Sequence, residues 1–195
     1  QHEKKSEKNN TAAETQIKEI NRFIEEKSNN GKQVLVIAPV KVEKQLKIPE
    51  SCESEHFNSF LGVDQYSSFD VVIVVGRNQM KVTDLERIGR SIFFDDDREL
   101  ELIEGTKLPM ERRRYSTSKD NIKSRTVQVQ YHPDERIDGI LKQTRENESV
   151  QGCYRIRPLR GEPKEIILLS NLPVDLEVDD LVDWKTYRTE FRDYS

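Results

Sequence analysis

The sequence has few of the residues that form metal centres or disulfide-linked folds. Its two cysteines, Cys52 and Cys153, lie far apart and lack the short paired spacing of zinc sites and redox motifs. Its three histidines, His2, His56 and His132, have no partner at metal-ligand spacing. We therefore expect free thiols, a reducing cytoplasmic location and no bound metal.

Long apolar runs are also absent. No segment approaches the roughly 20 apolar residues that a membrane span requires, so we expect no contact with a membrane. Charged residues make up 35% of the 195 positions. Hydrophobic residues make up 34%, and this content is enough to fill one core but not two. The net charge of −4 argues against a protein that is basic on every face, although clustered arginines can still bind phosphate.

A phosphate-binding loop of the form Gly-x-x-x-x-Gly-Lys-Ser/Thr is missing, so the chain alone should not hydrolyse ATP. The acidic run Asp95-Asp96-Asp97 has no phosphate-binding residues near it in sequence, and we interpret it as a turn that ends a helix, not as a magnesium site. Gln1 is not a start methionine, and no charged-then-apolar leader follows it. We expect that the chain was cut from a longer polypeptide.

Three apolar runs of strand length are present instead. Val34–Ala38, Val71–Val75 and Ile166–Leu169 are continuously apolar, which is typical of strands buried on both faces of a parallel sheet. Segments with helical spacing of apolar residues lie before the first run, at 11–28, and between the second and third runs, at 132–151. This alternation predicts an α/β fold with a mostly parallel sheet and helices on both faces.

The rest of the chain is more polar. We expect a flexible tail at residues 1–10, one domain over 11–184 and a second tail at 185–195. Within the domain, residues from about 95 to 125 are highly charged and read as an excursion from the core. Weaker local patterns predict further elements: short helices at 42–46, 84–94 and 176–184, a weak strand or loop at 56–57 and a half-exposed strand at 126–131.

Three arginines follow the helix at 132–151 and precede the last strand: Arg155, Arg157 and Arg160. In motor ATPases, an arginine brought across a domain cleft neutralises charge on the γ-phosphoryl group, because its planar fork fits phosphate oxygens. Such a group contributes about three to five decades of rate. The alternative is a solvated turn in which these arginines pair with Glu148 and Glu162.

This region resembles the C-terminal lobe of helicases carried in phage and mobile-element primase-helicase proteins. Those lobes have an Arg-Glu-x-Glu helix, a glutamine, a Gly-Arg-x-Arg-x-x-Arg cluster and a strand that ends in Asn-Leu-Pro. This sequence has Arg145-Glu-Asn-Glu148, then Gln151, the three arginines, and Asn171-Leu-Pro173 after the strand. Tyr154 stands where the family usually has glycine.

The resemblance extends upstream and covers residues from about 31 to 184. His56-Phe57, followed by Leu61-Gly62, resembles a His-Phe-Gly-x-x-Arg-Gly loop in which leucine replaces the arginine. The apolar run that ends in Gly76-Arg77 resembles a strand that ends in Gly-Arg-Pro, and loops at the carboxyl ends of parallel strands bind ligands in α/β proteins.

The resemblance implies a RecA-like helicase lobe. ATP with Mg²⁺ would lie in a cleft between this lobe and an N-terminal P-loop lobe of the same polypeptide, with Arg155, Arg157 and Arg160 reaching across. Gln151, Gly76 and Arg77 would lie near the nucleotide, and His56 and Phe57 near nucleic acid. Closure on ATP and opening after hydrolysis would alternate the grip of the two lobes on a strand.

A basic run offers a second nucleic-acid contact. Arg112, Arg113 and Arg114 precede Tyr115, so the run could follow a phosphate backbone while the tyrosine stacks on a base; the alternative is a solvated loop. Lys119, Lys123 and Arg125 extend the run. We expect the partner to be a single- or double-stranded nucleic acid, and DNA rather than RNA.

Two other classes of function remain open. A non-enzymatic α/β module would bind nucleic acid or an acidic partner with the same basic residues, and Tyr154 and Leu61, the two departures from the family pattern, favour it slightly. A small nuclease or phosphatase is disfavoured because the sequence has no clustered carboxylate or histidine constellation.

Overall fold

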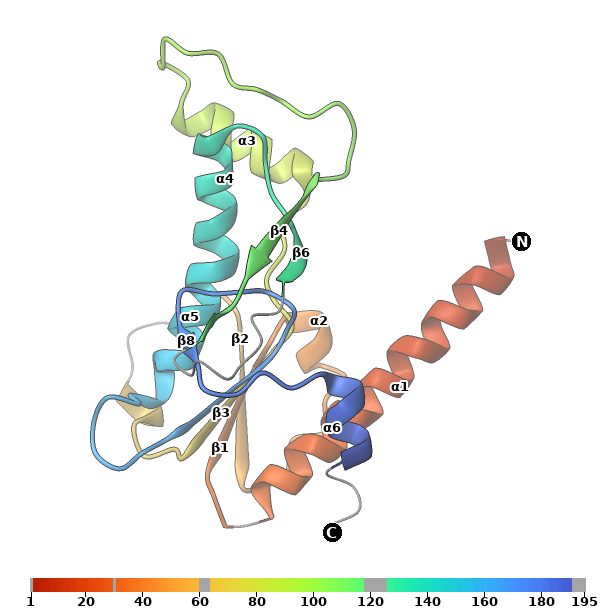
Figure 1. Cartoon of the computed structure of the whole chain (residues 1–195), viewed down its shortest axis with the longest axis vertical. Helices are drawn as coiled ribbons and strands as arrows, with labels where there is room; N and C mark the ends of the chain where they lie inside the picture. Colours follow the sequence, from red (N-terminus) through yellow and green to blue (C-terminus); the bar gives the residue numbers. More distant parts are fainter. Residues whose placement is uncertain (1, 30, 60–63, 118–125, 191–195) are drawn as a thin grey trace.

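The computed structural model describes residues 2–29, 31–59, 64–117 and 126–190. A four-stranded parallel sheet in the order β2-β1-β3-β7 lies at its centre (Figure 1). The strands are β1 (Val34–Ala38), β2 (Cys52–His56), β3 (Val71–Val75) and β7 (Glu165–Leu169). The α/β class and the parallel sheet expected from the apolar runs are confirmed.

Helices cover both faces of this sheet, as predicted. All residues of β1 and β3 are buried, so alternate side chains fill two separate cores. On one face, Val36 and Ile73 pack with α1 (His2–Ser28), and on the other, Ile37 and Val74 pack with Cys153 of the long helix. The first face is closed by α6 (Trp184–Glu190). The ring of Trp184 in α6 packs edge to face against the ring of Phe23, with 5.7 Å between the ring centroids.

The connections between strands differ in length. Short elements, α2 (Val40–Glu43) and the 3₁₀ turn η1 (Asp64–Tyr66), follow β1 and β2. After β3 the chain leaves the sheet through α3 (Val82–Ile92) and returns along one long helical stretch. That stretch consists of α4 (Glu135–Lys142), the π-helical turn η2 (Gln143–Asn147), α5 (Glu148–Cys153) and the 3₁₀ turn η3 (Tyr154–Ile156).

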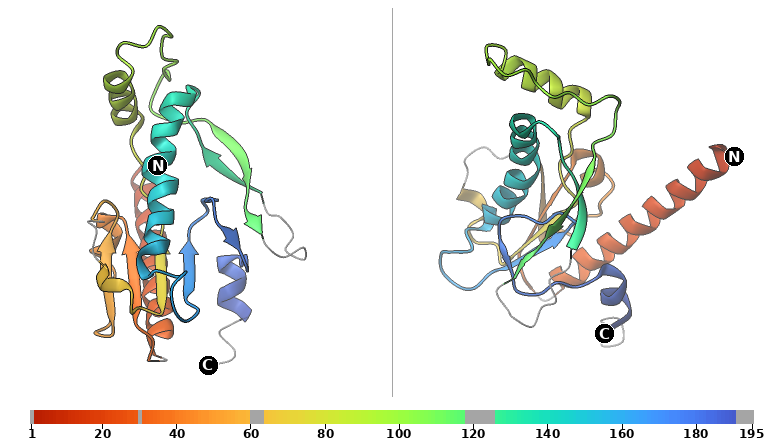
Figure 2. Two further views of the ribbon diagram at one scale, coloured as in Figure 1. Left: turned by 90° about the vertical axis from the view of Figure 1, so that its left-hand side faces the viewer. Right: turned by 45° about the horizontal axis from the view of Figure 1, so that its top comes forward.

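The excursion forms a structured arm, defined here as α3, residues 93–109, the antiparallel pair β4 (Met110–Arg114) and β6 (Thr126–Gln130), and α4. Its own apolar cluster joins Leu85 of α3 to Ile137 and Leu141 of α4. The arrowheads of the parallel strands point toward the arm (Figure 2, left). The arm therefore stands at the carboxyl edge of the sheet.

Arg136 holds the irregular segment 93–109 against α4. Its guanidinium donates to the backbone oxygens of Arg98 (2.8 Å) and Glu99 (2.9 Å), and it pairs with Asp96 and Asp134. The acidic run at 95–97 is thus part of a turn clamped by an arginine. The described residues contain no group of carboxylate, cysteine or histidine side chains suited to a metal.

Several boundaries expected from the sequence are wrong. Helix α1 begins at His2, not after Asn10, because lysine and glutamate continue a helix well without an apolar face. The stretch expected as a helix at 176–184 contains β8 (Glu177–Val178), which pairs in parallel with β5 (Ser116–Thr117). The helix starts only at Trp184 and continues to Glu190, into the expected tail. The charged excursion contains β4, whose residues alternate between exposed and half-buried.

Membrane-spanning character is not found in the described helices, since none is both long and apolar enough to cross a bilayer.

Gly89 sets the distance between α3 and α4. A Cβ atom there would lie 2.8 Å from Cγ1 of the fully buried Ile137, whereas one at Gly139 would meet nothing within 4 Å. We expect Gly89→Ala to lower the free energy of unfolding by about 1–2 kcal/mol through overpacking, and Gly139→Ala to raise it by about 0.5–1 kcal/mol. Urea denaturation measures both, and equal stabilisation by the two variants would contradict this packing.

Asp134 gives the arm a pH-dependent contact. It caps α4 by accepting from the Arg136 amide, and the hydrogen bond from the Arg136 guanidinium holds the pKa of Asp134 well below its usual range. The stability from this carboxylate is therefore complete above its unfolded pKa of about 3.9 and is lost as pH falls.

Asp134→Asn keeps the capping oxygen and removes the charge. We expect the variant to have a lower free energy of unfolding than the wild type at pH 7. The difference between the two free energies should narrow below about pH 4, and urea unfolding at both pH values measures it. The exposed Asp84, which pairs with Arg87 at 3.5 Å, provides the matched control Asp84→Asn. A difference in free energy of unfolding that does not change with pH would show that the charge of Asp134 contributes nothing to stability.

Candidate functional site

The carboxyl ends of the four parallel strands meet at one edge of the sheet, the edge that faces the arm. The chain passes from β1 to β2 on one side and returns to β3 on the other side of β1, so the topological switch point lies between β1 and β3. Open α/β sheets bind ligands at this place. The residues that follow these strands are therefore the first candidates for a site.

Gly76 and Arg77 follow β3 at the switch point. Gly76 has φ +70°, and a Cβ atom on it would lie 3.7 Å from the Pro39 ring that follows β1. The turn directs Arg77 toward β7, where its Nη1 donates to Oδ1 of Asn171 at 3.0 Å. Burial, and then repulsion from Arg145, lower the pKa of Arg77. Arg77 is thus a half-buried cation close to a second cation.

Arg145 and Glu146 form a buried pair between the long helix and the arm. Nε and Nη2 of Arg145 donate to the Glu146 carboxylate at 2.9 and 2.6 Å, and Nη1 donates to the backbone oxygen of Gln130 at 2.8 Å. Glu146 also pairs with Arg113 of β4. Both residues lie in the π-helical turn, a feature often found at functional sites.

Glu148 faces the same edge one turn further along. It accepts from the side-chain amides of Asn78, at 3.5 Å, and Asn58. Burial raises the pKa of Glu148. Asn58 has φ +70°, an uncommon conformation for a residue other than glycine, and asparagine tolerates it best. The amides of two loops thus meet on one carboxylate.

Side chains of β4 point alternately to two faces, so the arginines of the basic run lie on opposite faces of the strand. Arg113 is half-buried and bound to Glu146, whereas Arg112 and Arg114 are exposed on the other face of the strand. Tyr115 is half-buried, and its hydroxyl donates to the backbone oxygen of Ser170 after β7 at 3.4 Å. Burial raises the pKa of Tyr115. Lys119, Lys123 and Arg125 lie outside the described residues.

The proposed contact from Phe57 is wrong. Phe57 is 3% exposed and packs in the core with Ile37 and Tyr66, so its ring cannot stack on a base. His56, the last residue of β2, is partly exposed at the carboxyl edge beside Ala38. Leu61 lies outside the described residues.

The arginine cluster lies at the opposite edge of the sheet. Arg155 is in η3, and Arg157 and Arg160 lie in the connection that enters β7 at its amino end. Arg157 has φ 53°, the left-handed conformation. Lys164 ties this connection to the sheet by donating to the backbone oxygens of Ile156, at 2.6 Å, and of Ser67.

The fold does not bring Arg77 and the arginine cluster together. Arg77 follows a strand and the cluster precedes a neighbouring parallel strand, so the length of β7, about 17 Å at 3.3 Å per residue, separates them. One phosphate group cannot contact both. Gln151 is exposed on α5, between the two edges.

The chain matches no protein-family model, no curated protein and no solved structure. The resemblance to a helicase lobe is therefore one of short sequence motifs.

The buried pair should dominate the stability of the joint between sheet and arm. Glu146→Gln would leave Arg145 buried without its counter-charge, and we expect a loss of about 3–5 kcal/mol in the free energy of unfolding. Glu26→Gln, in the exposed pair of Arg22 and Glu26, is the matched control and should cost about 0.3–0.5 kcal/mol. Chemical denaturation tests both, and a loss below about 1 kcal/mol for Glu146→Gln would refute the dominant role.

Proposed function

We propose that this chain is the second, RecA-like lobe of an ATP-dependent nucleic-acid helicase or translocase. In this proposal Arg155, Arg157 and Arg160 reach ATP and Mg²⁺ held by a separate P-loop lobe, and the carboxyl edge meets nucleic acid. The observation that carries it is the division of arginines between opposite edges of one parallel sheet. A motor lobe needs two such surfaces, one for each ligand.

The backbone of Arg157 supports the nucleotide side. A residue other than glycine in the left-handed region costs about 1–2 kcal/mol, and such strain gathers at functional sites. The tether from Lys164 holds the connection in place. A guanidinium presented from a fixed turn is suited to charge that develops on a phosphoryl group, since no reorganisation is then needed.

The carboxyl edge supports the nucleic-acid side. Arg77 and Asn171 offer a cation and an amide at this edge, and Arg112 and Arg114 are exposed on the arm that stands over it. Contacts of this kind bind the phosphate backbone without reading sequence, and they weaken steeply as salt is added. Tyr115 serves here as a brace between β4 and the end of β7, and stacking on a base is not part of the proposal.

A non-enzymatic binding module is the second candidate. Tyr154 is 40% exposed at the position where the family has glycine, immediately before the arginines, and this observation favours it. In such a module the arginines would bind a partner but would not take part in hydrolysis. Measuring turnover separates the two.

The role of Arg157 in ATP hydrolysis can be tested with variants of a polypeptide that contains both this chain and the P-loop lobe. Arg157→Asn suits the left-handed backbone and Arg157→Lys keeps the charge but loses the fork. We expect both to reduce the kcat of DNA-stimulated ATP hydrolysis, Arg157→Asn by about a thousandfold or more, while ATP binding persists. Arg22→Ala, on the exposed face of α1, is the control. Unchanged turnover in Arg157→Asn would leave only the binding module.

A further inference from the structure

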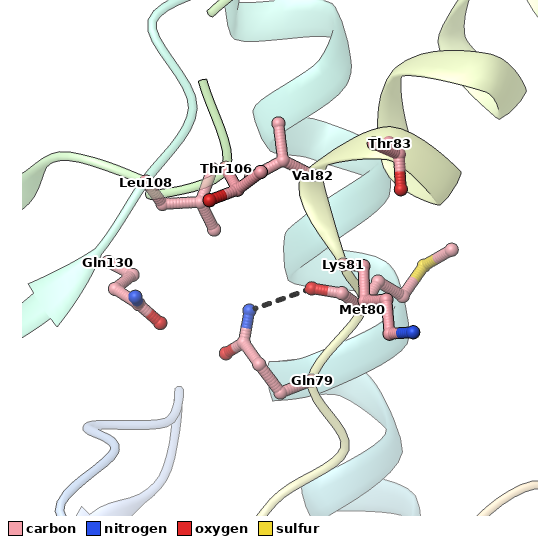
Figure 3. Close-up of a pocket in the computed structure, with 8 residues that line it drawn as sticks. All are labelled: Gln79, Met80, Lys81, Val82, Thr83, Thr106, Leu108 and Gln130. Atoms are coloured by element: carbon pink, nitrogen blue, oxygen red, sulfur yellow. Dashed lines mark hydrogen bonds between the residues drawn. The ribbon is translucent and has the colours of Figure 1, made fainter. Parts of the chain in front are cut away.

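A hollow of about 280 Å³ lies between the start of α3, the segment before β4 and the end of β6. Gln79 and Gln130 stand on two sides of it, and Val82, Thr106 and Leu108 form one border (Figure 3). Val82 and Leu108 are buried members of the arm cluster. The hollow thus combines an apolar wall with polar groups that face across it.

Those polar groups are available for a ligand. Nε2 of Gln79 makes one long contact, 3.4 Å to the backbone oxygen of Met80. Within the described part of the chain, no residue forms a hydrogen bond with the Gln130 carboxamide or the Thr106 hydroxyl. Each carboxamide presents two donors and an acceptor. A flat ligand with donors and acceptors on its rim, and with little charge, fits this set.

The hollow adjoins the cationic part of the carboxyl edge. Gln79 follows Arg77 by two residues, and the backbone oxygen of Gln130 accepts from Arg145, which lies close enough to lower the pKa of Arg77. Phosphate-binding and amide-rich groups are therefore neighbours. A nucleotide unit of a single strand offers the matching pair, a phosphate and an unpaired base.

We propose that this hollow receives one unpaired adenine of a single strand whose phosphate lies at Arg77. A glutamine carboxamide pairs with adenine through two hydrogen bonds, to N6 and N7, and Gln79 and Gln130 both face the hollow. Bases in a single strand are free to enter it because their edges are unpaired. The inference rests on the nucleic-acid side of the proposed function and adds base preference to it.

The test is the affinity of the 195-residue chain for fluorescent 12-mers of dA, dC and dT, measured by anisotropy at one salt concentration. The wild type should bind the dA strand at least about fivefold more tightly than the others. Gln79→Leu and Gln130→Leu should each reduce that ratio toward one by weakening the binding of the dA strand. Gln128→Leu is the matched control, because Gln128 is exposed on the same strand and does not line the hollow. Thermal midpoints establish that each variant is folded.

Three results would overturn the proposal. The first is equal affinity of the wild type for all three strands, and the second is a dA preference that survives in both leucine variants. The third is displacement of the dA strand by AMP at an equal nucleotide concentration, because the hollow would then take a free nucleotide. None of these touches the role of Arg157 in turnover, so failure here is distinguishable from failure of the motor assignment.

Discussion

The burial of Arg145 against Glu146 is the constraint on which the arrangement of sheet and arm depends. Arg145 is 0% exposed, and its guanidinium is held by the carboxylate and by the backbone of β6. Leaving either charge buried alone would cost several kcal/mol, so the long helix, β6 and Arg113 of β4 must assemble together. The π-helical turn buries two consecutive residues, Arg145 and Glu146, at one place. The arm is thereby fixed to the sheet by charge as well as by apolar packing.

The central strands were predictable because their environment is uniform. β1 and β3 are buried on both faces, so every residue is apolar and the pattern needs no knowledge of neighbours. The long helix was predictable from the capping Asp134 and the apolar spacing of Ile137 and Leu141. β4 was not, because Met110–Arg114 is mostly charged and its pairing depends on contacts with β6 and Glu146, far away in sequence. No local pattern contains that information.

The candidate site also contains residues that could be predicted from the sequence and residues that could not. Arg77 and Arg157 could be named from sequence, and even their separation follows from strand direction, since one arginine follows a strand and the other precedes a parallel neighbour. The meeting of Asn58, Asn78 and Glu148 could not be foreseen, because three distant segments supply it. Phe57 was assigned to nucleic acid from its resemblance to a His-Phe loop, whereas its ring packs in the core. Sequence indicates chemistry at single positions, whereas the fold decides which positions meet.

The charges at the joint also link ligand binding to the stability of the arm. Arg77, Arg113 and Arg145 are three cations near one carboxylate, that of Glu146, whereas Glu148 accepts from the amides of Asn78 and Asn58. The joint thus has an excess of positive charge in a half-buried place. A phosphate at Arg77 would offset the repulsion between Arg77 and Arg145. Because any ligand that binds only the folded form stabilises it, an anion at the carboxyl edge would also hold the arm more firmly against the sheet. Binding at this edge and rigidity of the arm are therefore two readouts of the same electrostatic imbalance.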